Sequence, residues 1–156
     1  ESMNFAALKG LPVLFICENN GLAVHANIKN RQAFQIRDLV AAYKIPYHQC
    51  AKGFDPLTVQ NETAKVAELV RRSGRPQFLE IATCRYKEHV GVNDDLQAGY
   101  RSAKDLNFWR ANDPLIHDVG LIKKFDDTIR AEIIEAVEYA QKTPWPHPRE
   151  LLADVL

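Results

Sequence analysis

Apolar and polar positions along this chain alternate in blocks that predict strands separated by helices. Residues 13–17 form an apolar run with no polar interruption, which is typical of a strand covered on both faces of a sheet. Residues 77–84 predict a second long strand, and residues 46–49 predict a short one. Helical spacing or helix boundary signals predict helices over 2–9, 31–44, 55–73, 103–110 and 126–142.

Strands that alternate with helices indicate an α/β fold with a parallel sheet and helices on both of its faces. In such sheets ligands bind beyond the carboxyl ends of the strands. Two segments follow predicted strands and are rich in polar residues, namely 18–30 and 85–101. The second is long for a loop in a compact domain, so we expect it to be either functional or disordered.

Composition narrows the class of protein. The chain has 156 residues, the length of about one domain, and its 20 Lys and Arg balance 20 Asp and Glu. This neutrality gives no support to nucleic-acid binding, and no apolar run reaches the roughly 18 residues of a membrane span. Three cysteines, at 17, 50 and 84, follow no metal-binding pattern. We expect reduced thiols, no zinc and a cytoplasmic protein.

The first candidate site follows the first strand as Glu18-Asn19-Asn20-Gly21. Asparagine side chains and backbone carbonyls are oxygen ligands that suit Mg²⁺. The alternative is structural: Asn-Gly between apolar runs is a strong hairpin signal, with Leu22-Ala23-Val24 as the returning strand. Spacing alone favours the hairpin.

The second candidate site is Arg85 and His89, four residues apart at the end of the last predicted strand. Both side chains can donate hydrogen bonds to phosphate, Arg in a bidentate manner. In isolation an exposed pair is the simpler interpretation. Asn93, Asp94 and Asp95 in the same loop could bind a cation, although such loops are usually only solvated. No glycine-rich phosphate loop occurs.

Several segments, taken in order, resemble the α subunit of thiamine-diphosphate-dependent 2-oxo acid dehydrogenases (the E1 component) and of acetoin dehydrogenases. The resemblance covers nearly the whole chain. It is carried by residues 1–8, 11–13, 17–21, 53–55, 83–89 and 100–101, with Trp109 and Asp113-Pro114.

The resemblance implies a site for thiamine diphosphate and Mg²⁺. Asn20 would bind Mg²⁺ through its side chain and Leu22 through its carbonyl. Arg85 and His89 would hold the diphosphate, with His89 near the reacting centre as the catalytic residue. The implied cofactor-binding set is Glu18, Asn20, Leu22, Arg85 and His89.

The family's Gly-Asp-Gly segment, which supplies an aspartate to the metal, has no counterpart in the nineteen residues before Asn20. We therefore expect residues 1–156 to be part of a thiamine-diphosphate-binding domain whose N-terminal portion is missing. Residues from about 1 to 100 would form the sheet core and cofactor loops. Residues from about 101 to 156 would form C-terminal helices and an extended arm.

The resemblance also implies an activity. An E1-type α subunit would decarboxylate a 2-oxo acid oxidatively, or cleave acetoin, and pass the acyl group to a lipoyl-bearing acyltransferase. The activating glutamate comes from a β subunit in this family, so an α₂β₂ assembly is implied and this chain alone would be inactive. Two alternatives remain: a non-catalytic α/β interaction module, and a transketolase-like half, against which the Arg-Tyr-x-x-His segment weighs.

Overall fold

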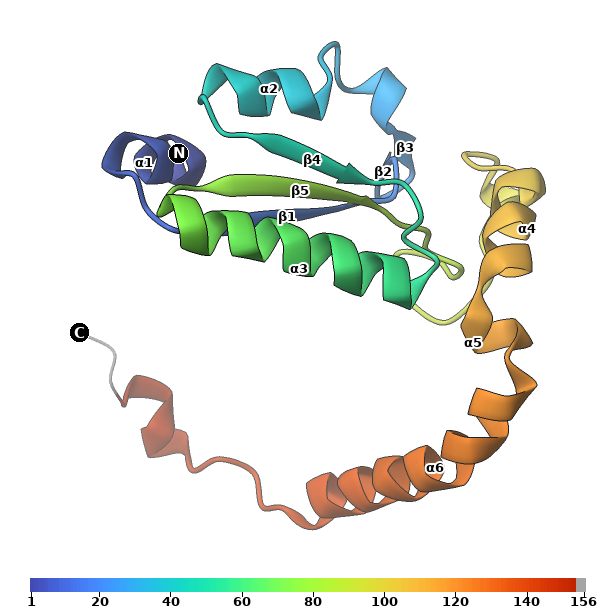
Figure 1. The fold of residues 1–156 in the computed structure, drawn as a ribbon. Helices are drawn as coiled ribbons and strands as arrows, with labels where there is room; N and C mark the ends of the chain where they lie inside the picture. Colours follow the sequence, from blue (N-terminus) through green and yellow to red (C-terminus); the bar gives the residue numbers. More distant parts are fainter. Residues whose placement is uncertain (154–156) are drawn as a thin grey trace. The chain divides into compact units, whose positions relative to one another are not determined.

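The computed structural model describes residues 1–153 and confirms the predicted α/β fold (Figure 1). Three parallel strands form the sheet in the order β1 (Leu14–Asn19), β5 (Gln77–Ala82) and β4 (Tyr47–Cys50). β5 is central and pairs with both neighbours in parallel register. The carboxyl ends of β1 and β5 therefore lie side by side.

Helices cover both faces of the sheet (Figure 1). On one face, α3 (Pro56–Ser73) places Val66 in a buried cluster with Leu79 and Ile81 of β5. On the other face, α1 (Ser2–Lys9) and α2 (Ile36–Ala42) pack on a cluster that contains Val40 and Phe78. Burial of these two apolar surfaces fixes the central strand, and with it the position of the segment that follows β5.

The ends of α3 agree with the signals in the sequence. The Asp55 side chain accepts a hydrogen bond from the Leu57 amide at 3.1 Å, and Pro56 occupies the first turn. Gly74 ends the helix in the left-handed conformation, with φ of 65°. This conformation carries no steric cost for glycine, so the residue terminates the helix without strain.

Several predicted boundaries were wrong. β1 continues to Asn19, so Glu18 and Asn19 belong to the strand, and β5 ends at Ala82 rather than at residue 84. The helix expected over 31–44 is confined to α2, preceded by the short 3₁₀ turn Ile28–Asn30. Phe34 is 49% exposed, so the residues before Ile36 bury too little apolar surface to stabilise more helix.

Shorter elements complete the first compact unit, which comprises residues 1–117. A small antiparallel pair, β2 (Leu22–Ala23) and β3 (Ala26–Asn27), follows β1. The segment after β5 contains one 3₁₀ turn, Leu96–Ala98, and leads to α4 (Ala103–Asn112) and α5 (Pro114–His117).

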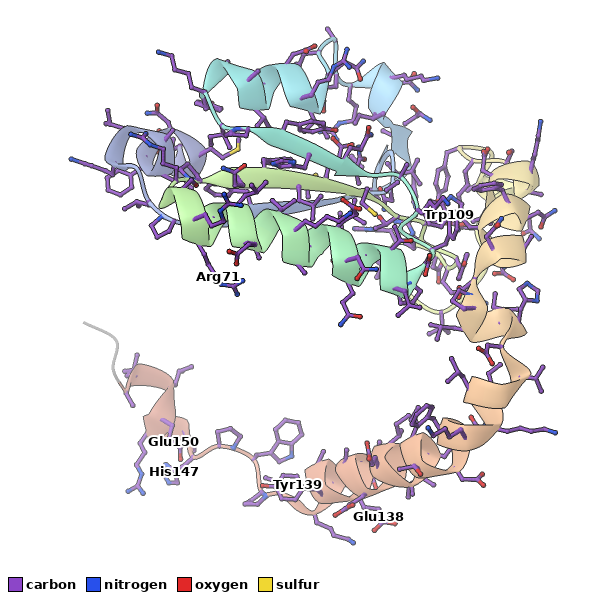
Figure 2. The ribbon with its side chains drawn as sticks, in the orientation of Figure 1. Arg71, Trp109, Glu138, Tyr139, His147 and Glu150 are labelled. Carbon is purple, nitrogen blue, oxygen red and sulfur yellow. The ribbon has the colours of Figure 1, made fainter. Side chains whose placement is uncertain are left out.

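A second compact unit begins at Asp118. Its main helix, α6 (Val119–Lys142), starts seven residues earlier than expected because the Asp118 side chain caps it, accepting from the Leu121 amide at 2.9 Å. A 3₁₀ turn, Pro148–Leu152, follows, and His147 and Glu150 form its capping box (Figure 2). Within residues 1–153, no helix has the length and apolar character needed to cross a bilayer.

Candidate functional site

The candidate site lies where β1 and β5 end. The Thr83 amide donates to the Asn19 carbonyl at 3.0 Å, which extends the pairing of the two strands by one residue. The chain then diverges into residues 20–22 on one side and 83–85 on the other. The structure thus brings together the two segments that sequence analysis identified, which are separated by about sixty residues in the chain.

Residues 19–22 form a tight turn stabilised by two asparagine side chains. Asn19 Oδ1 accepts from the Gly21 amide at 2.8 Å, and Asn20 Oδ1 accepts from the Leu22 amide at 2.9 Å. Gly21 has φ of 70°, a conformation that glycine adopts without a Cβ penalty. Hydrogen bonds from asparagine side chains to amides two residues on are characteristic of such turns.

The hairpin alternative at Asn20-Gly21 was wrong. Leu22–Ala23 does not return along β1 but pairs with Ala26–Asn27. The tip of that hairpin is Val24-His25, where Val24 has φ of 54°. The first turn is instead stabilised by its own asparagine side chains, and its Asn19 and Gly21 carbonyls accept from the Thr83 and Ile28 amides.

Arg85 leaves the end of β5 and holds several parts of the site. Its Nη2 donates to the Tyr100 hydroxyl at 2.7 Å and to the Val24 carbonyl at 3.4 Å, while Nε donates to the Lys87 carbonyl at 2.8 Å. Its Nη1 lies 3.0 Å from Nδ1 of His89. Arginine only donates, so Nδ1 is the acceptor and neutral His89 carries its proton on Nε2.

These contacts use four of the five N–H groups of the guanidinium. Among the contacts of the described residues, one N–H on Nη1 is left for a ligand. Most of the donors of Arg85 therefore bind the protein itself. A bidentate contact with phosphate would require one of these internal hydrogen bonds to break.

A buried ion pair that sequence analysis missed organises the same loop. Asp95 and Arg101 have side chains that are 6% and 7% exposed, and Arg101 Nε donates to Asp95 Oδ1 at 2.8 Å. Arg101 also donates to the carbonyls of Tyr86 and Lys87, at 3.2 Å each, and to that of Arg85. Asp95 is therefore neither solvated nor free for a cation, while Asp94 pairs with Lys87 at 3.2 Å.

Tyr100 links this ion pair to the hairpin. Its hydroxyl donates to Asp95 and accepts from Arg85, and its ring lies 4.9 Å from that of His25 between centroids. Tyr100-Arg101 contributed to the family resemblance, but the sequence held no separate signal that these residues contact Arg85.

The two segments and α4 enclose a cavity of about 360 Å³. Trp109 of α4 lines it and packs edge-on against Phe54, with centroids 5.5 Å apart (Figure 2). Its lining includes Asn20, Leu22, Lys29, Thr83, Cys84, Arg85 and Arg101. Glu18, which is exposed on β1, and His89 do not line it.

Two side chains beside the cavity have raised pKa values. Burial raises the pKa of the Cys84 thiol, although the positive charges of Arg101 and Arg110 act against this effect. Burial and a 2.8 Å hydrogen bond to Asp113 raise the pKa of the Tyr86 hydroxyl, which therefore stays protonated and anchors the loop to the start of α5. Neither group is prepared for acid–base chemistry at neutral pH.

The oxygen donors at the turn fit a hard cation that is bound mainly by a phosphate ligand. Asn20 Oδ1 has a second lone pair, and the turn presents backbone carbonyls beside it. Within residues 1–153 no group of three or more His, Cys, Asp or Glu side chains could hold a metal. Because Mg²⁺ usually keeps several waters and binds few protein ligands together with phosphates, the donor set suits Mg²⁺ bound to a phosphorylated ligand.

The charges of the cavity favour an anionic ligand. Lys29, Arg85 and Arg101 line it and outnumber the one carboxylate of the lining, Asp105. Asp95 largely balances the charge of Arg101 and also lies 3.6 Å from Arg85. Positive groups and oxygen donors that line one cavity could hold a diphosphate bridged by a cation. The arrangement is suited to binding and orientation rather than to nucleophilic catalysis by this chain.

Comparisons with known proteins cover almost the whole chain. Residues 1–149 match the family described as dehydrogenase E1 component. The pyruvate dehydrogenase E1 component subunit alpha of Zymomonas mobilis is 32% identical over 169 residues, covering 100% of this chain and 46% of that protein. The corresponding protein of Rickettsia bellii is 30% identical, over 99% and 50% of the two chains.

A relative with a different substrate is about as similar. The 2-oxoisovalerate dehydrogenase subunit alpha of Bacillus subtilis is 30% identical, over 97% of this chain and 49% of its own length. The chain thus spans about half the length of the curated relatives it matches. The chain is thus about equally identical to relatives whose names give different 2-oxo acids, so the degree of identity does not indicate one substrate.

Proposed function

Because this chain belongs to the dehydrogenase E1 component family, among the α subunits of 2-oxo acid dehydrogenases, we propose that it binds the diphosphate of thiamine diphosphate together with Mg²⁺. The observation that carries the proposal is the cavity at the ends of β1 and β5. There Asn20, Leu22 and Lys29 from one segment line the same cavity as Arg85, which comes from a distant part of the chain.

Each of these residues has a role that follows from its chemistry. Asn20 Oδ1 and the Leu22 carbonyl would ligate Mg²⁺, and waters and phosphate oxygens would complete its shell. Lys29 and the remaining Nη1 proton of Arg85 would balance the charge of the diphosphate. Glu18, which is exposed on β1, would contribute to binding only from outside this cavity.

When bound, thiamine diphosphate supplies the electron sink for decarboxylation of a 2-oxo acid or cleavage of acetoin. His89 would act near the reacting centre as the catalytic residue of this chain. Its Nδ1 accepts from Arg85, so its Nε2–H is the group that can donate to a substrate. Arg85 thus both binds phosphate and fixes the tautomer of His89.

The whole enzyme requires more than these residues. We propose a cytoplasmic α₂β₂ assembly in which a β subunit supplies the acid that activates the cofactor, and a lipoyl-bearing acyltransferase receives the acyl group. This chain alone would be inactive in that scheme. The family membership supports the proposal.

One observation favours a second candidate, a non-catalytic module that keeps the fold. Four of the five N–H groups of Arg85 contact the protein itself, so the loop is organised without a ligand. In that case the cavity would bind neither thiamine diphosphate nor Mg²⁺.

The test is equilibrium binding of thiamine diphosphate to the native subunit assembled with its β partner. We expect saturable binding with Mg²⁺, loss of binding in EDTA, and weak binding of thiamine, which lacks the diphosphate. Arg85→Ala should weaken binding, whereas Arg75→Ala should not, because Arg75 precedes β5 while Arg85 follows it. Absence of saturable thiamine diphosphate binding, with or without Mg²⁺, would favour the non-catalytic module.

A further inference from the structure

A buried carboxylate lies behind the turn that carries the proposed metal ligands. Glu80 of β5 is 9% exposed, and its two oxygens accept separate hydrogen bonds. Asn19 Nδ2 donates to Oε1 and the Tyr47 hydroxyl donates to Oε2, both at 2.8 Å. Burial of a carboxylate is costly unless its oxygens are satisfied, so the two donors account for its presence here.

The contact with Glu80 decides which way the Asn19 amide points. An amide has a donor end and an acceptor end, whereas a carboxylate only accepts. The donor end of Asn19 therefore faces Glu80, and its oxygen faces the turn, where it accepts from the Gly21 amide at 2.8 Å. If the amide were reversed, its oxygen would face the carboxylate and its NH₂ group would face the Gly21 N–H.

Tyr47 holds Glu80 from the opposite side. Burial and the bond to Glu80 raise the pKa of the Tyr47 hydroxyl, so it keeps its proton and remains a donor at neutral pH. Glu80, Asn19 and Tyr47 also line one cavity, of about 330 Å³, which adjoins the proposed cofactor cavity through Lys29. Glu80 is absent from the lining of the cofactor cavity, so it acts through Asn19.

The turn transmits this orientation to the proposed ligands. Its Gly21 carbonyl accepts from the Ile28 amide at 2.9 Å, and Asn20 Oδ1 accepts from the Leu22 amide. We propose that Glu80 is a positioning residue: its carboxylate orients the Asn19 amide, which fixes the turn that presents Asn20 and Leu22 to the cation. This inference rests on the proposed function.

A pair of substitutions with opposite expected effects tests whether Glu80 orients the Asn19 amide. Asn19→Asp places two carboxylates against each other and removes the donor. Glu80→Gln alone can still accept from Asn19. In the double variant the new amide at position 80 can donate to one oxygen of the new carboxylate at position 19, while the other oxygen accepts the Gly21 N–H. The single Asn19→Asp variant should thus be impaired and the second change should rescue it.

The first readout is the affinity for Mg²⁺ at a fixed concentration of thiamine diphosphate, in the native subunit assembled with its partner. Loss of a partner that orients a metal ligand costs roughly 10–100-fold in affinity, which is the effect expected for Asn19→Asp. The double variant should recover most of this loss. Tyr47→Phe is the matched control, because it removes the other bond to Glu80 and leaves the bond to Asn19.

The second readout needs no cofactor. Amide hydrogen exchange at Gly21 reports whether Asn19 Oδ1 still accepts this proton, with the Val66 amide of α3 as the reference for overall stability. Exchange at Gly21 relative to Val66 should rise in Asn19→Asp, return in the double variant and stay unchanged in Tyr47→Phe. If Asn19→Asp does not fold, Asn19→Ala adds no charge and should raise the same ratio.

The outcomes separate the two proposals. Wild-type affinity for Mg²⁺ in Asn19→Asp, or a double variant no better than the single one, would overturn the positioning role of Glu80. A wild-type subunit that binds no thiamine diphosphate would instead refute the proposed function. In that event Gly21 exchange still tests the contact between Glu80 and Asn19. An unchanged ratio of Gly21 to Val66 exchange in Asn19→Asp would show that this contact does not orient the Asn19 amide.

Discussion

Arg101 and Asp95 form an ion pair in which both side chains are almost fully buried, and Arg101 also binds the carbonyls of residues 85–87. The pair fixes the backbone at the point where Arg85 leaves β5. The pair therefore stabilises the segment that carries Arg85, although neither Arg101 nor Asp95 belongs to the set expected to bind the cofactor.

Asp95→Asn should destabilise the loop strongly, because it leaves the charge of Arg101 buried without its partner. Removal of one member of a buried pair costs about 3–5 kcal/mol. Asp94→Asn is the matched control, since Asp94 and Lys87 are 64% and 55% exposed and such pairs contribute at most about 1 kcal/mol. Urea unfolding and amide exchange over residues 85–101 would measure both effects, and equal losses would contradict a supporting role for the buried pair.

Arg85 and His89 should affect different kinetic parameters of the assembled enzyme. Arg85→Lys cannot reproduce the fork that contacts Tyr100, Val24 and His89, so thiamine diphosphate affinity should fall about 10–100-fold, equivalent to about 1.5–3 kcal/mol. His89→Ala should lower kcat by roughly 10²–10⁴-fold. Because His89 does not line the cavity, this substitution should weaken the affinity less than Arg85→Lys does. Titration of the cofactor and steady-state kinetics separate the two, and a His89 variant that loses only affinity would refute its catalytic role.

Gly21→Ala should weaken cation binding through backbone strain alone. A Cβ at Gly21 meets no atom within 4 Å, but φ of 70° costs an L-residue about 1–2 kcal/mol. Gly74→Ala is the control, because Gly74 has φ of 65°, equally open space and a position at the end of α3. Both variants should lose similar stability in urea, and only Gly21→Ala should lose Mg²⁺ affinity. A similar loss of affinity in Gly74→Ala would show that the effect is not local.

Gly53→Ala should reduce stability more than Gly21→Ala or Gly74→Ala does, for a steric reason. A Cβ at Gly53 would overlap the carbonyl oxygen of Ala82, the last residue of β5, so the backbone must move. Overpacking of this kind typically costs about 1–3 kcal/mol, and here it also displaces the strand end that carries Thr83 and Arg85. A greater loss of thiamine diphosphate affinity than in Gly74→Ala is expected, and unchanged binding would contradict the close approach.

Sequence patterns predicted the sheet because residues 13–17 are a continuous apolar run and the two further strand segments alternate with predicted helices. They predicted α3 because Asp55, Pro56 and Gly74 are unambiguous boundary signals. The family resemblance, confirmed by the match over residues 1–149, directed attention to Asn20 and Arg85, which the structure brings to one cavity. The roles of Glu18 and His89 stay predictions, since neither lines that cavity.

Other features could not be predicted because they depend on contacts between distant residues. Glu80 reads as a polar interruption of a strand, and only the register of β5 beside β1 and β4 reveals its contacts with Asn19 and Tyr47. In the sequence Asp95 likewise looks like part of an acidic loop, and only the structure shows its contact with Arg101. In both cases a charged residue is buried because a specific partner satisfies it, and composition carries no signal of such a partner.

Cys84, which lines the proposed cofactor cavity, offers a pH-dependent probe of that site. Burial raises the pKa of its thiol, so less reactive thiolate is present at neutral pH than for an exposed cysteine. Alkylation by iodoacetamide, followed residue by residue with mass spectrometry, should therefore rise with pH through a midpoint above that of an unfolded control.

Two charge changes should shift this midpoint in opposite directions. Arg110→Gln removes a positive charge that lowers the pKa, so it should slow alkylation at a fixed pH, whereas Asp105→Asn should speed it. Shifts of the same sign in both variants would show that access to the cavity, rather than the charge around the thiol, controls the reaction.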